Sequence, residues 1–196
     1  MQMSYSKKLE YEIILKDSFL IIKCCPKCNR KTHFKNTKKF RINANNNKLD
    51  IWLIYQCKEC KHTLNLAIYE RQIVSSIPKE EYQYFLKNNE QLAEMYGKNI
   101  KLFKKNKAEI DFGKLDYDIV KRNETIENSG FVGQIFITIN NPYMLKIRPE
   151  KQIAMVLGLS RNQVKNFLDQ DKIKLEMAFP QFISIRIHSL PFYMDK

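Results

Sequence analysis

Four cysteines in two close pairs are the residues with the clearest chemistry. The pairs are Cys25-Pro26-Lys27-Cys28 and Cys57-Lys58-Glu59-Cys60. A C-x-x-C turn directs two sulfurs at one point, and two such turns supply a tetrahedral four-thiolate site. Zn²⁺ suits this donor set because it is borderline-soft, has no redox role and accepts four thiolates at about 2.3 Å. The spacing therefore predicts a structural zinc ion held by Cys25, Cys28, Cys57 and Cys60, with no open position for catalysis.

Other chemistry for these cysteines fits the sequence less well. Disulfides need an oxidising compartment, for which no targeting signal is present. A thioredoxin-like redox pair usually occurs singly, beside a βαβ pattern. Iron stays an alternative metal, because ligand type alone does not exclude it. Cys24 is an alternative to Cys25 as a ligand and His62 could compete, although four thiolates already fill the shell, and His33 and His62 fit ordinary surface residues better.

The segments that must position the sulfurs have the pattern of β-structure. Asn29 follows the first pair, where such turns often need left-handed backbone angles. Alternation in Phe40–Ala44, a strand-forming run in Leu49–Tyr55 and alternation in Leu64–Ile68 predict three strands, with a turn at Asn45–Asn47. This order is that of a zinc ribbon. A sheet this small needs help from the metal, with about 10–16 kcal/mol of apparent binding, so chelation is expected to unfold the ribbon.

Several runs of residues resemble a known family. They are Cys25–Cys28, Phe40–Asn45, Leu49–Tyr55, Cys57–His62, Tyr69–Arg71 and Ile77–Tyr82. Together they are similar to an uncharacterised bacterial family, the domain-of-unknown-function family 1062, over most of the chain. This resemblance implies a bacterial cytoplasmic protein and carries no established activity.

The middle of the chain predicts a helix followed by mixed structure. Pro78 and the acidic residues after it mark a helix start, and an amphipathic pattern continues until Gly97. The basic run Lys98–Lys107 fits a short helix or a solvated loop. Alternation of apolar and polar residues predicts two strands, Asp116–Lys121 and Ile135–Ile139. The segment between them, Asn123–Gly133, predicts a loop.

The C-terminal segment predicts a helix, a tight turn, a second helix and a hairpin. Arg148-Pro149 begins the first helix and Gly158 ends it. Ser160 begins the second, and the Ser-x-x-Gln spacing to Gln163 is that of a capping box. Two extended segments follow, Ile173–Leu175 and the alternating Ile183–Ile187.

Part of this segment resembles the S-four-type RNA-binding domain, a fold named for a ribosomal protein. The matching residues are Arg148, Leu157-Gly158-Leu159-Ser160-Arg161, Val164, Phe167-Leu168 and Ile173. The resemblance covers Arg148 to Leu175 and implies that Arg148, Arg161 and Lys165 contact RNA backbone. The chain departs from the family pattern at three places. These are Pro149-Glu150 in place of Leu-Asp, Asp171 where glycine is typical, and Leu175-Glu176-Met177 in place of the Val-Asn-Gly turn.

The helical geometry supports an anion site without any family. On a helical wheel Arg161, Lys165 and Lys172 fall within about 40° of one another. Free backbone N–H groups and the helix dipole favour phosphate at a helix N-terminus. We therefore predict Arg148, Arg161, Lys165 and Lys172 as RNA-binding residues. The alternatives are the solvated face of an ordinary helical hairpin and a helix-turn-helix on DNA.

Composition narrows the class of protein. Lys+Arg number 34 against 21 Asp+Glu, for a net charge of +13, while 44% of residues are hydrophobic. This profile predicts a core-forming cytoplasmic protein with no membrane association, because no run approaches the roughly 20 apolar residues of a membrane span. Positive charge attracts phosphate polymers, although a general bias toward Lys, Asn and Ile would also produce it. Nucleotide-loop, nucleophile-elbow and metalloprotease motifs are absent, so we expect no enzymatic activity.

These observations predict an α+β protein of three parts. They are a zinc-ribbon β domain at 1–75, a helical and irregular connector at 76–133, and an α/β module resembling the S-four-type RNA-binding domain at 134–196. The expected function is non-catalytic binding of structured RNA or the ribosome. The alternative is a protein–protein adaptor or a DNA-binding, transcription-associated module. The oligomeric state does not follow from the sequence.

Overall fold

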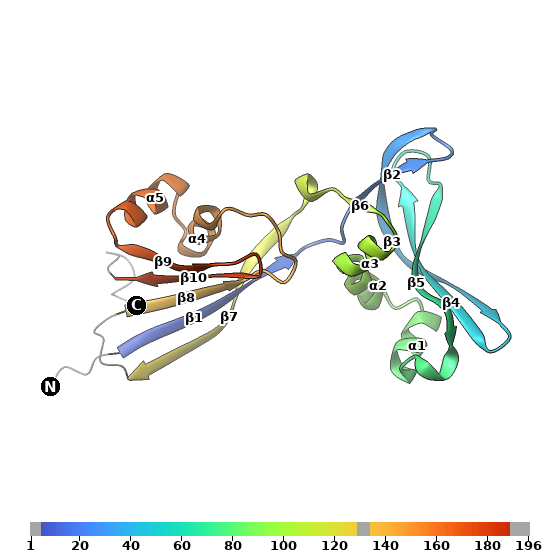
Figure 1. The fold of residues 1–196 in the computed structure, drawn as a ribbon, viewed down its shortest axis with the longest axis horizontal. Coiled ribbons are helices and arrows are strands. Elements are labelled where there is room, and N and C mark those ends of the chain that lie inside the picture. Colours follow the sequence, from blue (N-terminus) through green and yellow to red (C-terminus); the bar gives the residue numbers. More distant parts are fainter. Residues whose placement is uncertain (1–4, 129–133, 189–196) are drawn as a thin grey trace. The chain divides into compact units, whose positions relative to one another are not determined.

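Two five-stranded sheets organise the chain, and helices accompany each of them (Figure 1). This mixed α+β computed structural model describes residues 5–128 and 134–188. One compact unit, here called the central unit, is Leu15–Asp116; the terminal unit combines the residues up to Ile14 with those from Tyr117 onward. This division differs from boundaries after residues 75 and 133, because the expected connector supplies helices to the central unit and the first strand joins the C-terminal sheet.

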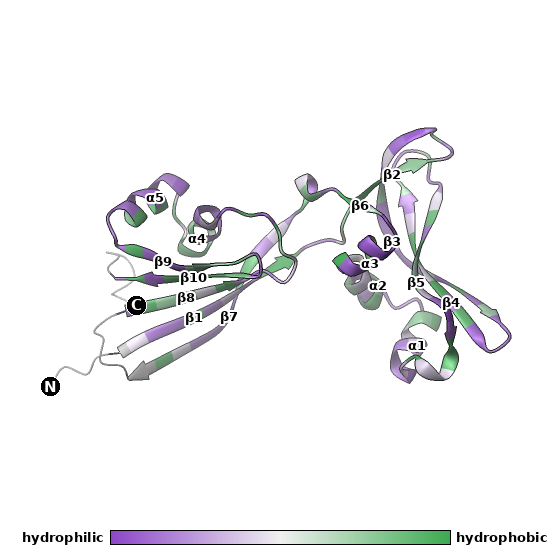
Figure 2. Ribbon diagram, in the orientation of Figure 1, coloured by the Kyte–Doolittle hydropathy of each residue, from purple (hydrophilic) through white to green (hydrophobic). Residues whose placement is uncertain are grey.

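The sheet of the central unit has the strand order β5-β4-β3-β2-β6, and its neighbouring strands are antiparallel. The strands are β2 (Ile21–Cys25), β3 (Arg30–Asn45), β4 (Lys48–Cys57), β5 (Thr63–Ile73) and β6 (Glu109–Ile110). Every second residue of β4 from Leu49 to Cys57 is buried, as in a strand with one face against a core. The corresponding alternation of hydrophobic and hydrophilic residues is visible along the strands in Figure 2. The three strands predicted around Asn45–Asn47 are present, and β2 and β6 extend the sheet.

Helices and aromatic rings complete a core on one face of this sheet. The elements are the short turn η1 (Val74–Ser76), α1 (Lys79–Leu86), α2 (Glu90–Gly97), α3 (Ile100–Lys105) and the short turn η2 (Phe112–Lys114). The ring of Phe103 from α3 lies 5.6 Å from that of Phe19 and 5.9 Å from that of Tyr55, edge to face in both cases. All three side chains are fully buried. The central unit thus has an apolar core that a metal ribbon alone would lack.

The long helix predicted to end at Gly97 is divided into two. Asn88 has a φ of 50°, which ends α1, and the Asn89 side chain caps α2 by accepting the Leu92 N–H. The basic run after Gly97 contains the short helix α3 and buries Phe103. Of the two expectations for that run, the helix is therefore confirmed.

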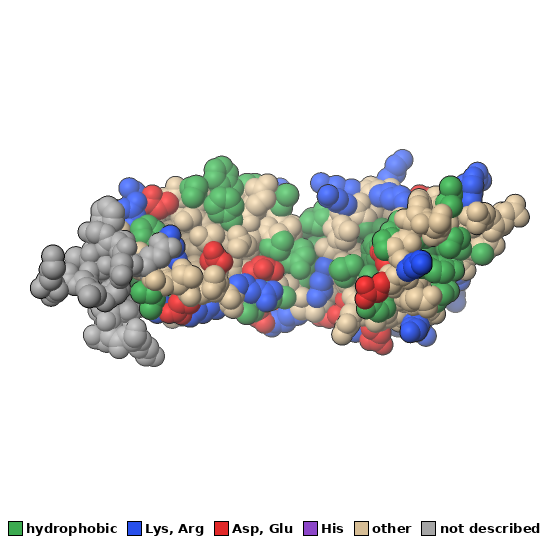
Figure 3. Space-filling view, turned by 90° about the horizontal axis from the view of Figure 1, so that it is seen from below, with side chains coloured by type: hydrophobic (Ala, Val, Ile, Leu, Met, Phe, Trp, Pro, Cys, Tyr) green, Lys and Arg blue, Asp and Glu red, His purple; other side chains and the backbone are tan. Residues whose placement is uncertain are grey.

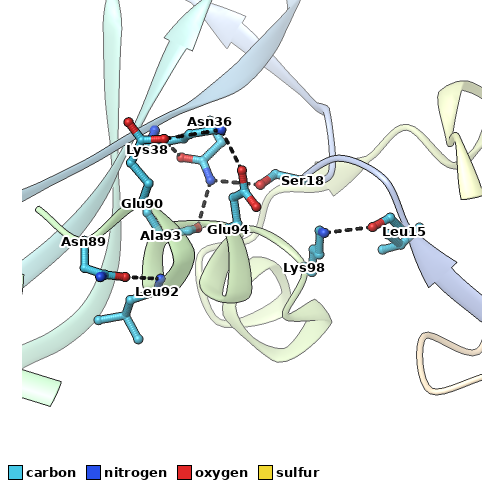
Figure 4. Close-up of polar contacts among 10 residues, drawn as sticks. All are labelled: Leu15, Ser18, Asn36, Lys38, Asn89, Glu90, Leu92, Ala93, Glu94 and Lys98. Atoms are coloured by element: carbon cyan, nitrogen blue, oxygen red, sulfur yellow. Dashed lines mark hydrogen bonds and ion pairs between the residues drawn. The ribbon is translucent and has the colours of Figure 1, made fainter. Parts of the chain in front are cut away.

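A bulge in β3 joins the sheet to α2. The pairing of β3 with β4 shifts within residues 36–40. The Asn36 side chain donates a hydrogen bond to the Ala93 carbonyl at 2.8 Å (Figure 4). Lys38, with a φ of 60°, pairs with Glu94 at 2.6 Å. The bulge therefore carries polar side chains out of the ladder and onto the helix.

Gly97 is required for close packing rather than for a turn. It lies within α2 and has no left-handed backbone angle. A Cβ at this position would overlap the side chains of Ser18 and Asn36, which are themselves hydrogen-bonded to each other at 2.9 Å (Figure 4). The predicted helix end at Gly97 is confirmed, because α2 ends there, and the close packing is an additional role of this glycine.

The sheet of the terminal unit has the order β7-β1-β8-β10-β9. The strands are β1 (Tyr5–Leu15), β7 (Tyr117–Asn128), β8 (Gln134–Asn140), β9 (Ile173–Ala178) and β10 (Phe182–Ile187). β1 and β8 are parallel, whereas β10 is antiparallel to both of its neighbours. The strands predicted at Ile135–Ile139 and Ile183–Ile187 are confirmed. The loop predicted from Asn123 is wrong as far as Asn128, which ends β7, and its remainder, 129–133, lies outside the described residues.

Two helices lie on the same side of the terminal sheet in Figure 1, α4 (Pro149–Leu157) and α5 (Arg161–Asp169). Gly158 ends α4 with a φ of 66°, the left-handed conformation that glycine adopts freely. Both hydrogen bonds of the predicted capping box between Ser160 and Gln163 are present at the start of α5. Ile153 and Val164, one from each helix, are fully buried. None of the helices in the described ranges is long and apolar enough to cross a membrane.

Candidate metal centre and basic pocket

The two C-x-x-C segments form turns of the same kind between neighbouring strands. The first joins β2 to β3 and the second joins β4 to β5. Each is closed by one backbone hydrogen bond, from the Asn29 N–H to the Cys25 carbonyl at 2.8 Å and from the Lys61 N–H to the Cys57 carbonyl at 3.2 Å. Asn29 has a φ of 52° and Lys61 a φ of 65°. Both closing residues are left-handed, as predicted for Asn29, although lysine is less suited to this conformation.

These turns bring the sulfurs of Cys25, Cys28, Cys57 and Cys60 within 4.8 Å of one another. The Cys25 and Cys60 sulfurs are 3.4 Å apart, and those of Cys28 and Cys57 are 3.9 Å apart. A tetrahedron with metal–sulfur bonds of about 2.3 Å has sulfur–sulfur edges of about 3.8 Å. The four sulfurs could therefore hold one metal ion. Cys24 is exposed and lies outside this group.

The immediate surroundings of the sulfurs favour negative charge at Cys57. Burial opposes its ionisation, but hydrogen bonds from Thr32 and from the backbone N–H groups of Cys60 and Glu59 outweigh burial and lower the pKa of this thiol. The hydroxyl of Thr32 is 3.2 Å from the Cys57 sulfur and is buried with it. By contrast, a hydrogen bond with Cys60 and burial raise the pKa of Cys28. A divalent cation held by the four sulfurs would favour their thiolate form and displace any thiol proton.

Two further contacts lie near the sulfur cluster, and no sequence pattern predicted either of them. Arg30 pairs with Glu59 at 2.6 Å and so connects the residue after the first turn to the second turn. His33 lies outside the sulfur group, and its Nε2 is 2.8 Å from a carboxylate oxygen of Asp111. His33 is thus a partly buried hydrogen-bonding residue, and His62 is exposed.

A second candidate site is a basic pocket in the terminal unit, with a volume of about 280 Å³. Its lining comes from the starts of two helices. Arg148 is the N-cap of α4 and Glu150 is in the first turn of that helix. Arg161 and Asn162 begin α5, and Lys165 follows one turn later. Three of the four predicted RNA-binding residues therefore meet here, while Glu150 and Asn162 were not predicted to take part.

Lys172, the fourth predicted residue, does not line this pocket. The helical-wheel argument does not hold for it, because α5 ends at Asp169 and Asp171 turns the chain with a φ of 56°. The Lys172 ammonium instead lies 5.5 Å from the centre of the Phe167 ring, a cation–π distance.

The charge of the basic pocket favours an anion. Arg148, Arg161 and Lys165 form no ion pair with any residue in the described part of the chain, and Glu150 is the one carboxylate in the lining. The first N–H groups of a helix have no acceptor within the helix, and the dipole makes this end positive. Elsewhere, Lys and Arg are scattered over the face seen in Figure 3, so charge alone marks no site.

Comparison with known protein families gives a match over most of the chain. Residues 42–178 match the model of a family described as protein of unknown function, DUF1062. The chain belongs to this family. The match includes Cys57, Cys60 and the basic pocket, and it begins after Cys25 and Cys28. The resemblance noted in the sequence is confirmed at the level of this family. No curated protein and no solved structure matches the chain.

Proposed function

We propose that this protein is a non-catalytic RNA-binding protein that grips backbone phosphates with its terminal unit and uses structural zinc in its central unit. The observation that carries the proposal is the basic pocket, where Arg148, Arg161 and Lys165 converge at the starts of two helices. Structured RNA is recognised mainly by shape and by phosphate and 2′-hydroxyl contacts. Such recognition needs cations at fixed positions and few groups that read base edges.

The order of elements around the pocket supports this reading. Helix, tight turn, helix and hairpin follow one another in α4, α5, β9 and β10, as in the S-four-type domain. Asp171, which stands where that domain typically has glycine, adopts the left-handed angle that glycine would supply. The three cations of the pocket are also the positions that the resemblance assigns to backbone contact. The pairing of β1 and β7 into the same sheet is a feature of this chain beyond that comparison.

Zinc is the metal we propose for the four sulfurs. Four thiolates at tetrahedral spacing form a closed shell, which suits a structural zinc ion and leaves no coordination position for a substrate. The paired strands on either side of each turn support the proposal that these turns belong to a zinc ribbon. The ion would hold the β2–β3 turn against the β4–β5 turn.

The test of RNA binding is the affinity of the full-length protein for a structured RNA and for duplex DNA of equal charge, across a salt series. We expect RNA-preferring binding that weakens steeply with salt. The triple variant Arg148→Ala/Arg161→Ala/Lys165→Ala should bind RNA more weakly and lower the salt slope by about 0.7–0.9 per lost phosphate contact. Metal content and circular dichroism should stay unchanged in this variant.

A charge-matched variant is the control. Lys146, Lys151 and Lys174 are exposed in the same unit and lie outside the pocket, so their replacement by alanine removes the same charge. Equal losses in the two triple variants would show that only net charge matters and would overturn the pocket assignment. Equal affinity for RNA and DNA would favour the DNA-binding alternative. Binding to a macromolecule that resists salt would favour the adaptor.

A further inference from the structure

Trp52, the single tryptophan of the chain, lies on the face of the central sheet opposite its helices. Its neighbours Ile51 and Leu53 are fully buried on the helix side, and successive side chains of a strand point to opposite faces. Trp52 is partly exposed. It makes no ring–ring or cation–π contact within residues 5–128 and 134–188. No helix of the central unit covers that face of the sheet (Figure 1), so part of the Trp52 side chain is open to a ligand.

The two residues that flank this ring across the sheet are one cation and one small apolar residue. Arg41 of β3 is the cross-strand partner of Trp52 on one side, and Ala67 of β5 is its partner on the other. Four residues further along β4, about 13 Å away, Gln56 stands between Lys35 and Thr63. Between Trp52 and Gln56 on the same face of β4 lies Ile54, whose cross-strand partner on β5 is Asn65.

The charge on this face is not neutralised internally. Neither Arg41 nor Lys35 forms an ion pair with any described residue. One carboxylate, Asp50, lies on the same face as Trp52, two residues earlier in β4. Asp50 accepts the Arg71 backbone N–H at 2.8 Å, and Glu70 pairs with Lys105 at 3.1 Å. The two cations Arg41 and Lys35 therefore outnumber the single carboxylate Asp50 on this face, with apolar and amide groups between the cations.

We propose that this face, here called the Trp52 face, binds single-stranded nucleic acid, with a base stacked on Trp52 and backbone phosphates at Arg41 and Lys35. Stacking on an aromatic ring combined with cations along the backbone is the way proteins hold single strands. The amides of Gln56 and Asn65 have no hydrogen-bond partner among the described residues and are free to meet base edges. Charge complementarity favours this occupant over a protein segment, since an apolar partner would leave two cations unpaired.

The Trp52 face is separate from the basic pocket, and the inference does not depend on the proposed function. The two sites lie in different units and fit different forms of nucleic acid. Duplex or folded RNA suits phosphate contacts at the pocket, whereas stacking on Trp52 requires an unpaired base. Variants in one unit therefore test one site.

The experiment uses the full-length protein and its single tryptophan as the reporter. An oligouridylate of about ten nucleotides should quench the tryptophan fluorescence on titration, and a blunt RNA duplex of the same charge should quench it far less. The triple variant Arg148→Ala/Arg161→Ala/Lys165→Ala should retain the quenching. Loss of quenching in that variant would mean that the oligonucleotide binds only at the pocket, which overturns the proposal.

Substitutions on the face then separate stacking from charge. With a labelled oligouridylate and anisotropy as readout, Trp52→Ala should weaken binding roughly 5- to 100-fold, and Trp52→Phe should restore most of it. Arg41→Ala/Lys35→Ala should weaken binding and lower the salt slope, whereas the charge-matched Lys79→Ala/Lys101→Ala, on the helices, should do neither. Unchanged affinity in Trp52→Ala or in the Arg41/Lys35 variant overturns the proposal, as does equal loss in the helix variant. Because Trp52→Phe and the charge variant leave the apolar core intact, the outcome does not depend on the folding of Trp52→Ala.

Discussion

At the level of single residues, the sulfur cluster depends on two turn residues as well as on four cysteines. Asn29 and Lys61 both hold left-handed backbone angles. Asparagine visits this conformation readily, whereas most side chains lose about 1–2 kcal/mol there. We expect metal binding at this turn to offset that strain at Lys61. The free thiol of Cys24, one residue from a ligand position, sits on the exposed side of β2.

Substitution of neighbouring cysteines should separate ligand from bystander. Cys24→Ser should retain one metal ion per chain, because Cys24 lies outside the sulfur group. Cys28→Ser should lose most of the metal, because a hydroxyl is a far weaker ligand for a thiolate-preferring ion. Metal analysis of the purified variants checks this. Equal retention in both would show that the four clustered sulfurs are not the ligand set, and loss in Cys24→Ser would return Cys24 to it.

The His33–Asp111 contact predicts a pH-dependent contribution to stability. Burial opposes ionisation of Asp111, but hydrogen bonds with His33 and with the Gly113 N–H outweigh it and lower the pKa of the carboxyl. A group with a lowered folded-state pKa stabilises the fold above its unfolded pKa, and this contribution is lost as pH falls through the folded value. Asp111→Asn should therefore reduce the free energy of unfolding near neutral pH by about 1–3 kcal/mol, and the difference from the wild type should shrink as the pH falls below the unfolded pKa of about 3.9 and through the lowered folded pKa.

Urea denaturation at several pH values measures that difference. Glu109→Gln is the matched control, because Glu109 makes an exposed ion pair with Lys31 at 3.7 Å and such pairs contribute little. A destabilisation of Asp111→Asn that does not diminish as the pH falls through the acidic range would contradict the electrostatic origin of the effect.

At the level of elements, sequence patterns predicted the features that depend on neighbouring residues and missed the pairing of segments far apart in the chain. The helix caps at Gly158 and Ser160 and the strand-forming run in β4 were predicted from the sequence, because each depends on residues a few positions apart. The four cysteines of the sulfur cluster were predicted for the same reason, because each C-x-x-C turn is short. The parallel pairing of β1 with β8 joins segments more than a hundred residues apart, and no local pattern reports it. The basic pocket was predicted in part. Lys172 was wrongly assigned to it because the end of α5 was not recognised in the sequence.

Gly97→Ala tests the packing of α2 against the loop before β2. Alanine favours a helix over glycine by about 1 kcal/mol, but its Cβ would overlap Ser18 and Asn36, whose hydrogen bonds hold them in place. Overpacking should dominate, with a net loss of about 1–3 kcal/mol in urea denaturation. Gln91→Ala, on the exposed side of the same helix, should change stability by less than about 0.5 kcal/mol. A Gly97→Ala variant as stable as the wild type would mean that the loop moves aside freely.

At the level of the whole molecule, the two units differ in what stabilises them. All five cysteines lie between Cys24 and Cys60, so any metal bound by thiolates stabilises the central unit directly. That unit also has an aromatic core, which the expected zinc ribbon alone would lack. The buried isoleucines of β8 and β10 pack without a cysteine in the terminal unit. A metal held by these thiolates would therefore add its folding energy to one part of the chain.

Chelation should consequently loosen one unit and spare the other. We expect removal of the metal from the full-length protein to increase amide hydrogen exchange most strongly at residues 22–33 and 56–63, the two turns and their flanking strands. The aromatic core should limit the loss of protection around Phe85 and Phe103, and segments 6–14 and 134–187 should exchange as before. Cys24→Ser treated with the same chelator should behave as the wild type does. Unchanged exchange at both turns would show that the metal adds no stability, and a uniform increase in both units would show that they unfold as one.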